Sequence, residues 1–140
     1  MELGKRVGLI YIFNRNGEVL MYKRDESPKR IPEPGAWSIF GGVIDDRETP
    51  LGGMKRELKE ELKIMNGRVS HVKYIGKMVK KSTNQKLYFF EGRTDASLTE
   101  ISGESELKGR PIEYIPVEEI KRNVRKFEPS IRKFFLKNFP

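Results

Sequence analysis

The alternation of apolar and polar residues predicts a chain of short strands and helices. Residues 5–13 are expected to form a strand, because Val7, Leu9 and Tyr11 place apolar side chains at every second position. The Asn16-Gly17 pair that follows is a strong hairpin-turn signal. Further strands are expected at residues 18–24, 37–44 (interrupted by Gly41-Gly42), 69–80, 86–94 and 111–116, and helices at 49–63, 117–122 and 130–138.

Two polar segments are expected to be loops. Residues 25–35 are rich in proline and charge, and residues 95–110 are polar and contain glycine. No internal repeat or long linker divides the sequence, so a single domain over residues 1–140 is expected. The mixture of hairpins, one central helix and terminal helices predicts an α+β fold, with helices on the faces of a mixed β-sheet.

Composition narrows the functional classes. Hydrophobic residues make up 36% of the chain and charged residues 34%, so we expect a modest core and a strongly charged surface. No apolar run approaches the roughly 18 residues that a membrane span requires. The absence of cysteine excludes disulfides, thiolate metal sites and a cysteine nucleophile. We see no secretory signal in the first residues, and a cytoplasmic location is the default expectation.

The net charge of +8 leaves two interpretations open. A basic surface attracts polyanions such as nucleotides or nucleic acid. The same lysines and arginines also serve simply as a solubilising coat. No basic amphipathic helix dominates the sequence, so a membrane role is not expected.

The predicted helix at 49–63 separates its side chains into three stripes. Thr49 is a suitable cap, and Pro50 suits the first helical position. At about 100° per residue, the stripes are an apolar one (Leu51, Met54, Leu58, Leu62), an acidic one (Glu57, Glu60, Glu61) and a basic one (Lys55, Lys59, Lys63). The apolar stripe is expected to face the core.

The acidic stripe has two explanations. Like charges three or four residues apart destabilise a helix by about 0.2–0.5 kcal/mol per pair, and a hard cation such as Mg²⁺ would remove that cost. Taken alone, the stripe is more simply an acidic face in solvent. Gly53 lies one turn before Glu57, and serves either close approach of a phosphate or helix–sheet packing.

The spacing around this helix decides between them. Residues Gly42, Glu48, Arg56, Glu57, Glu60 and Glu61 match the polar and glycine positions of the Nudix box, and Leu58 and Ile64 match two aliphatic positions. Six such matches arise by chance about once in 10⁷ windows, at roughly 7% per position. The chain therefore resembles the Nudix hydrolase family, of the MutT-like kind. Lys63 departs from the pattern, which has glycine there.

The resemblance implies a Nudix-like α/β/α sandwich and a Mg²⁺-dependent hydrolase, with Mn²⁺ as an alternative ion. Its expected reaction is hydrolysis of a phosphoanhydride bond in a nucleoside diphosphate derivative or nucleoside triphosphate. By position in the box, Gly42, Glu57, Glu60 and Glu61 would hold the metal. Arg56 would hold the loop through an ion pair with a box carboxylate, with Glu48 supporting the site.

The resemblance leaves the general base open between Glu57 and a loop acid, Glu104 or Glu106. Lys23 and Arg24, at the end of the second strand, are candidates for phosphate contacts. Gly41 would let its backbone approach the phosphates. Phe127 would stack on a base, or else belong to the core.

Two rival functions remain. One is a non-catalytic Nudix-like module that binds nucleotides or RNA, and the other is a hydrolase of RNA 5′ ends or dinucleoside polyphosphates. RNA is not the favoured partner, because the sequence shows no run of alternating aromatic and basic residues. The favoured partner is a nucleotide-like small molecule, and a homodimer is compatible with the sequence.

Overall fold

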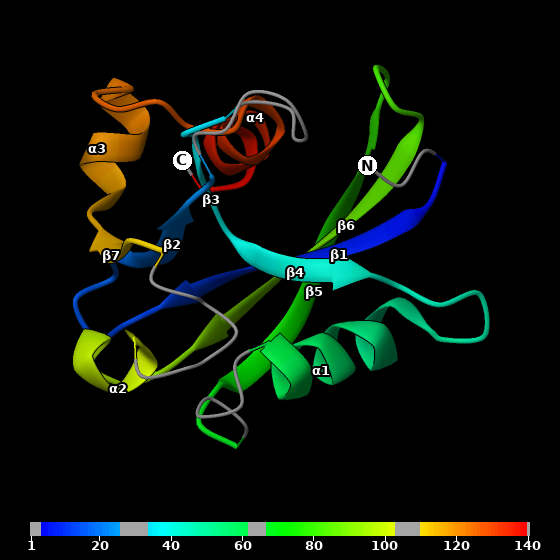
Figure 1. Cartoon of the computed structure of the whole chain (residues 1–140), viewed down its shortest axis with the longest axis horizontal. Helices are drawn as coiled ribbons and strands as arrows, with labels where there is room; N and C mark the ends of the chain where they lie inside the picture. Colours follow the sequence, from blue (N-terminus) through cyan, green and yellow to red (C-terminus); the bar gives the residue numbers. More distant parts are fainter. Residues whose placement is uncertain (1–3, 26–33, 62–66, 103–109, 140) are drawn as a thin grey trace.

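The computed structural model describes residues 4–25, 34–61, 67–102 and 110–139. Seven strands and four helices follow one another along these ranges (Figure 1). They are β1 (Arg6–Phe13), β2 (Val19–Lys23), β3 (Trp37–Ser38), β4 (Phe40–Val43), α1 (Pro50–Glu61), β5 (Ser70–Lys80), β6 (Gln85–Arg93), α2 (Leu98–Ser102), β7 (Ile112–Ile115), α3 (Val117–Arg122) and α4 (Pro129–Asn138).

The strands form one mixed sheet in the order β3-β2-β1-β6-β5, with β4 paired to β1 and β7 to β2. The pairing of β1 with β6 is parallel over the whole of β1, and the other pairings are antiparallel. Because β1 and β6 are parallel, their carboxyl ends lie at the same edge of the sheet. The predicted mixed sheet is confirmed.

Helices cover both faces of this sheet, as Figure 1 shows. On one face α3 and α4 pack over an aromatic layer that includes Tyr11, Phe89 and Phe134. On the other face α1 and α2 pack over a second layer that includes Ile10 and Phe90. This arrangement confirms the expected α/β/α sandwich. None of the described helices is long and apolar enough to cross a membrane.

Helix α1 begins as its sequence predicts. The hydroxyl of Thr49 accepts a 3.0 Å hydrogen bond from the backbone N–H of Gly52, and Pro50 is the first helical residue. Met54 and Leu58 are buried against the sheet. The prediction for Leu51 was wrong, since 39% of this residue is exposed. Leu51 lies in the first turn of α1. A helical wheel gives the direction of a side chain but not how far the sheet extends beneath the helix.

Two other predictions need correction. The segment 95–110 was expected to be a loop, but α2 forms within it. The strand at 37–44 breaks at Ile39 rather than at the glycine pair. The cause of the break is a change of partner, because β3 pairs with β2 whereas β4 pairs with β1.

Candidate active site

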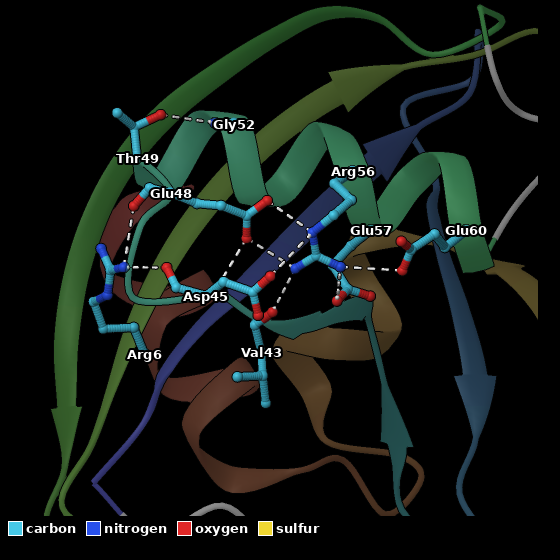
Figure 2. A network of polar contacts seen from close by, with 9 residues as sticks. All are labelled: Arg6, Val43, Asp45, Glu48, Thr49, Gly52, Arg56, Glu57 and Glu60. Carbon is cyan, nitrogen blue, oxygen red and sulfur yellow. Dashed lines mark hydrogen bonds and ion pairs between the residues drawn. The ribbon is translucent and has the colours of Figure 1, made fainter.

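The box residues come together where β4 and the following loop face helix α1. Figure 2 shows the carboxylates of Glu48, Glu57 and Glu60 around one guanidinium, that of Arg56. Arg56 is on the helix, and its partners come from the end of β4, the loop after it and α1 itself. One short stretch of sequence therefore supplies most of the site.

Arg56 binds Glu48 with a two-pronged ion pair. Its Nε donates to one carboxylate oxygen of Glu48 at 2.7 Å, and a terminal nitrogen donates to the other at 2.9 Å. The same terminal nitrogen donates to the carbonyl oxygen of Val43 at 2.9 Å. The ion pair that the sequence predicted for Arg56 is present, and it fastens the loop to the helix.

Glu48 also organises the loop itself. Its carboxylate accepts a 2.9 Å hydrogen bond from the backbone N–H of Asp45. Arg6, at the start of β1, donates to the backbone carbonyl oxygens of Asp45 and Glu48. Hydrogen bonds from Arg56, and then from the Asp45 backbone, lower the pKa of Glu48 to about 2. Glu48 is therefore a carboxylate over almost the whole pH range.

Glu57 occupies a more enclosed position. Its side chain is 13% exposed, and Arg56 lies 3.1 Å from its Oε1. Burial nevertheless raises the pKa of Glu57 above its ordinary value, with Arg56 opposing that shift. A partly desolvated carboxylate with a raised pKa gains more from a nearby cation than one in water does.

The two glycines of β4 have different neighbours. A Cβ placed on Gly42 would lie 2.3 Å from the Glu57 carboxylate, so the absent side chain makes room for that group. A Cβ on Gly41 would lie 1.8 Å from the carbonyl oxygen of Gly8 on β1. Gly42 therefore accommodates the site, whereas Gly41 permits the close approach of two strands.

Gly53 is explained by packing. A Cβ there would lie 2.9 Å from a methyl carbon of Ile44 and 3.2 Å from the Glu48 carboxylate. Of the two explanations for this glycine, close packing of the helix against β4 and its loop is the one with visible contacts.

Arg56 also supplies the counter-charge for the acidic stripe. Glu60 lies one helical turn further on, with its Oε2 3.0 Å from Arg56, and its side chain is 61% exposed. Arg56, and not a lysine of the basic stripe, is thus the protein cation beside the two acidic-stripe glutamates whose side chains are described. Arg56 and Glu60 are four residues apart, so they are neighbours on the helix surface. Grouping the side chains into apolar, acidic and basic stripes did not show this pair.

Within the described ranges, no three acidic or imidazole side chains are grouped to hold an ion. Glu57 and Glu60 instead turn toward Arg56, and the side chain of Glu61 is outside the described part. The donor chemistry nevertheless fits a hard divalent cation, because the Glu57 and Glu60 carboxylates lie three residues apart on one helix and Glu57 lies against Gly42.

Other predicted site residues lie elsewhere or outside the description. Glu104 and Glu106 fall outside the described residues. Lys23 ends β2, and its backbone N–H donates to the carbonyl of Pro111 at 2.9 Å. Arg24 follows, and its N–H donates to the carbonyl of Ala36 at 2.8 Å. These bonds fix the backbone and leave the proposed phosphate contacts of both side chains as predictions.

Phe127 belongs to the aromatic layer beneath α4. It is 6% exposed and forms a backbone β-bridge with Trp37 of β3. Its side chain belongs to the layer on the face of the sheet away from α1. Its burial favours the core alternative over base stacking. Base stacking by Phe127 stays a prediction.

Sequence reasoning missed two contributors, Arg6 and the carbonyl oxygen of Val43. Arg6 reaches the site from 39 residues away, and no local spacing signals that contact. Val43 contributes only backbone, which any residue type supplies. The antiparallel pairing of β1 with β4 brings both into place.

Comparison with known proteins identifies both the family and the fold. A family model for the NUDIX domain matches residues 2–137. The MutT protein from Methanosarcina mazei Go1 shares 20% identity, with a TM-score of 0.68, covering 95% of this chain and 91% of that one. DR0079 from Deinococcus radiodurans shares 19% identity with a TM-score of 0.70, covering 97% of this chain and 83% of that one. A MutT/Nudix family protein from Listeria innocua shares 15% identity with a TM-score of 0.69, covering 98% of this chain and 96% of that one.

These structural similarities show a shared fold. No curated protein matches the sequence. The family model is the finding that reaches beyond architecture, because it spans nearly the entire chain, including the acidic residues of α1.

Proposed function

Because the chain belongs to the Nudix domain family, we propose that it hydrolyses a phosphoanhydride bond in a nucleotide-like substrate with the help of Mg²⁺ or Mn²⁺. Family membership supports Nudix-type hydrolase activity in general. The observation that carries the finer proposal is the cluster of Glu48, Glu57 and Glu60 around Arg56, set against Gly42.

The proposed reaction is attack of water on one phosphorus. A new P–O bond forms, the bridging P–O bond breaks, and the leaving phosphate departs with the bridging oxygen. A bound divalent cation would supply neutralisation of charge on the phosphate oxygens. Glu57, Glu60 and Glu61, with the backbone at Gly42, are the groups that we propose hold it.

Arg56 acts in this proposal by positioning. It keeps Glu57 and Glu60 on one side of the helix and fastens the Glu48 loop beside them. A cation that entered would compete with the guanidinium for the same two carboxylates. The bonds from Arg56 to Glu48 and Val43 do not depend on those carboxylates, so the loop keeps its anchor.

The general base is proposed to be Glu57 or a loop acid, Glu104 or Glu106. Glu57 is fixed on the helix, and its raised pKa makes it a stronger base than an exposed glutamate. Measuring kcat for Glu57→Gln, Glu104→Gln and Glu106→Gln side by side separates them. A lost base lowers kcat by about 10²–10⁴-fold. If both loop variants keep wild-type kcat while Glu57→Gln is inactive, the base lies in the box.

The test of the function is a substrate panel with Mg²⁺ and with Mn²⁺. Nucleoside triphosphates, nucleoside diphosphate sugars, dinucleoside polyphosphates and 5′-triphosphate RNA are incubated separately, and mononucleotide, pyrophosphate and phosphate are measured. At least one substrate should turn over, and EDTA should abolish the turnover. Binding without metal-dependent turnover on any substrate would favour the non-catalytic binding module.

The metal ligands are tested by single substitutions. Glu60→Gln and Glu61→Gln should each lower kcat by several orders of magnitude and weaken Mn²⁺ binding measured by electron paramagnetic resonance. Glu118→Gln, an exposed glutamate on α3, is the control and should behave as wild type. Near-normal activity and Mn²⁺ binding in both box variants would rule these residues out as ligands.

A further inference from the structure

A groove lies between α1 and the start of β5, on the side of the helix that carries Lys55, Arg56 and Lys59. Its volume is about 450 Å³. Lys55 and Lys59 line it from the helix, and Val69 and Val72 line it from β5 and the residues before it. The groove therefore has an apolar floor and a basic wall.

The surface of β5 and β6 continues this groove with aromatic and basic side chains. Tyr74 is 49% exposed, and its ring centroid lies 6.4 Å from that of Tyr88. The ammonium group of Lys77 lies 5.7 Å from the centre of the Tyr88 ring. Cross-strand pairing puts Lys77 opposite Tyr88, and Val79 opposite Lys86, on this same side of the sheet.

The charge on this face has one sign. Of the described β5 and β6 side chains that point to the α1 side, none is acidic, and Lys77 and Lys86 are basic. Lys55 and Lys59 line the groove from the helix, and Lys77 lies over the Tyr88 ring, so ammonium groups accompany both parts of this surface. Lysines that merely solubilise a surface require no exposed tyrosine and valine among them.

We propose that this face, from Lys55 and Lys59 across Tyr74 to Lys86, is a binding site for single-stranded nucleic acid. Tyr74 would stack on an unpaired base, because every base presents a flat π-surface and half of this residue is open to solvent. The lysines would bind the backbone phosphates on either side of it. The site uses the flank of α1 that carries the lysines and borders the Arg56 cluster, and it does not depend on hydrolysis.

Charge favours nucleic acid over a second copy of the chain. A two-fold dimer through β5 would bring the same patch against itself, so that Lys77 and Lys86 of one copy face those of the other. Like charges so opposed are unfavourable, and nothing acidic on this face of the two strands offsets them. A polyanion removes that repulsion.

The experiment is fluorescence anisotropy of the full chain with labelled single-stranded RNA and DNA of about 12 nucleotides. Metal is omitted, so that binding is measured without turnover. Tyr74→Ala should weaken binding about tenfold, whereas Tyr74→Phe, which keeps the aromatic face, should bind as wild type. Lys77→Gln should lower the slope of log affinity against log salt by about 0.7.

Controls distinguish this site from other causes. Lys133→Gln with Lys137→Gln, both exposed on α4 beyond the opposite face of the sheet, should leave affinity unchanged. Glu57→Gln should also leave it unchanged, which separates failure here from failure of the proposed hydrolase. Equal affinities of Tyr74→Ala and wild type, or binding that follows total charge alone, would overturn the proposal. A dimer that is detected by sedimentation of the wild type and is absent in Tyr74→Ala would also overturn the proposal.

Discussion

Arg56 is the residue on which the geometry of the site depends. Its guanidinium holds Glu48 with two hydrogen bonds, contacts Glu57 and Glu60, and binds the carbonyl of Val43. A planar fork with five N–H donors serves all these partners together, and a lysine ammonium with three donors on a flexible stem does not. Charge alone therefore does not replace Arg56.

We expect Arg56→Lys to retain a folded chain with a lower Tm and a loss of about 10²-fold in kcat/KM, because the carboxylates would shift from their positions. Thermal unfolding and steady-state kinetics on the best panel substrate measure the two effects. Lys55→Arg, an exchange of cations at the adjacent helix position, is the matched control. An Arg56→Lys enzyme with wild-type kinetics would show that charge suffices.

The glycine pair of β4 separates folding from function at adjacent positions. Gly42→Ala should displace the Glu57 carboxylate, 2.3 Å from the new carbon, and lower kcat about 10²-fold with little change in Tm. Gly41→Ala should instead push β4 from β1 and reduce the free energy of unfolding by about 3 kcal/mol. Chemical denaturation and kinetics on both variants test the contrast. Equal effects of the two changes on stability would contradict it.

At the scale of elements, the sequence predicts those helices and strands whose ends and buried faces are set by nearby residues. Helix α1 has its cap, its proline and its apolar stripe within one segment, and it forms within two residues of the expected bounds. Helix α2 was missed because it is only five residues long. Its signal was nonetheless present, since Ser97 and Glu100 form a capping box in which each side chain binds the other's backbone N–H.

The capping box of α2 makes a prediction about pH. The Ser97 backbone, and then the guanidinium of Arg68, lower the pKa of Glu100 to about 2. This folded-state pKa is below the ordinary value of 4.5, so its stabilising contribution is complete above pH 4.5 and is lost as pH falls toward 2. Glu100→Gln should therefore lower Tm at neutral pH. The gap from wild type should close progressively between about pH 4.5 and about pH 2.

Thermal unfolding followed by circular dichroism across that range provides the measurement for Glu100. Glu118→Gln on α3, an exposed glutamate, is the matched change of one carboxylate and is measured over the same range. A gap for Glu100→Gln that stays constant with pH would mean that the lost contacts are independent of its charge.

Helix α4 is held by a buried carboxylate. Glu128 is 4% exposed, and its side chain accepts a 3.0 Å hydrogen bond from the backbone N–H of Ile131, with Lys80 at 3.5 Å. Glu128→Ala would leave that N–H and the ammonium without their partner. We expect unfolding free energy to fall by about 1–3 kcal/mol in urea denaturation, while kcat is retained. An unchanged urea midpoint would show that the cap adds nothing.

At the scale of the whole molecule, the fold assembles contacts that no segment contains. Arg6 reaches the loop at Asp45 because β4 pairs with β1, and Tyr74 meets Tyr88 because β5 pairs with β6. The box was recognisable because its residues lie within one short stretch. The basic and aromatic surface was not, because its members are spread over α1 and two strands and gather only in the folded chain.

Net charge supplies the last prediction. A chain of charge +8 should attract a polyphosphate substrate from beyond contact distance, and dissolved salt screens that attraction over about 10 Å at 0.1 M. With metal and substrate panel fixed, raising NaCl from about 20 to about 300 mM should lower kcat/KM about three- to tenfold and leave kcat nearly constant.

The double variant Lys133→Glu with Lys137→Glu changes the charge by −4, from +8 to +4, at exposed positions on α4. Its kcat/KM should be lower at low salt and should converge on the wild-type value at high salt, because the long-range field is then screened in both. Parallel salt curves displaced by a constant factor would instead mean that these lysines act through local contacts, and a flat wild-type curve would mean that the field of the molecule does not guide the substrate.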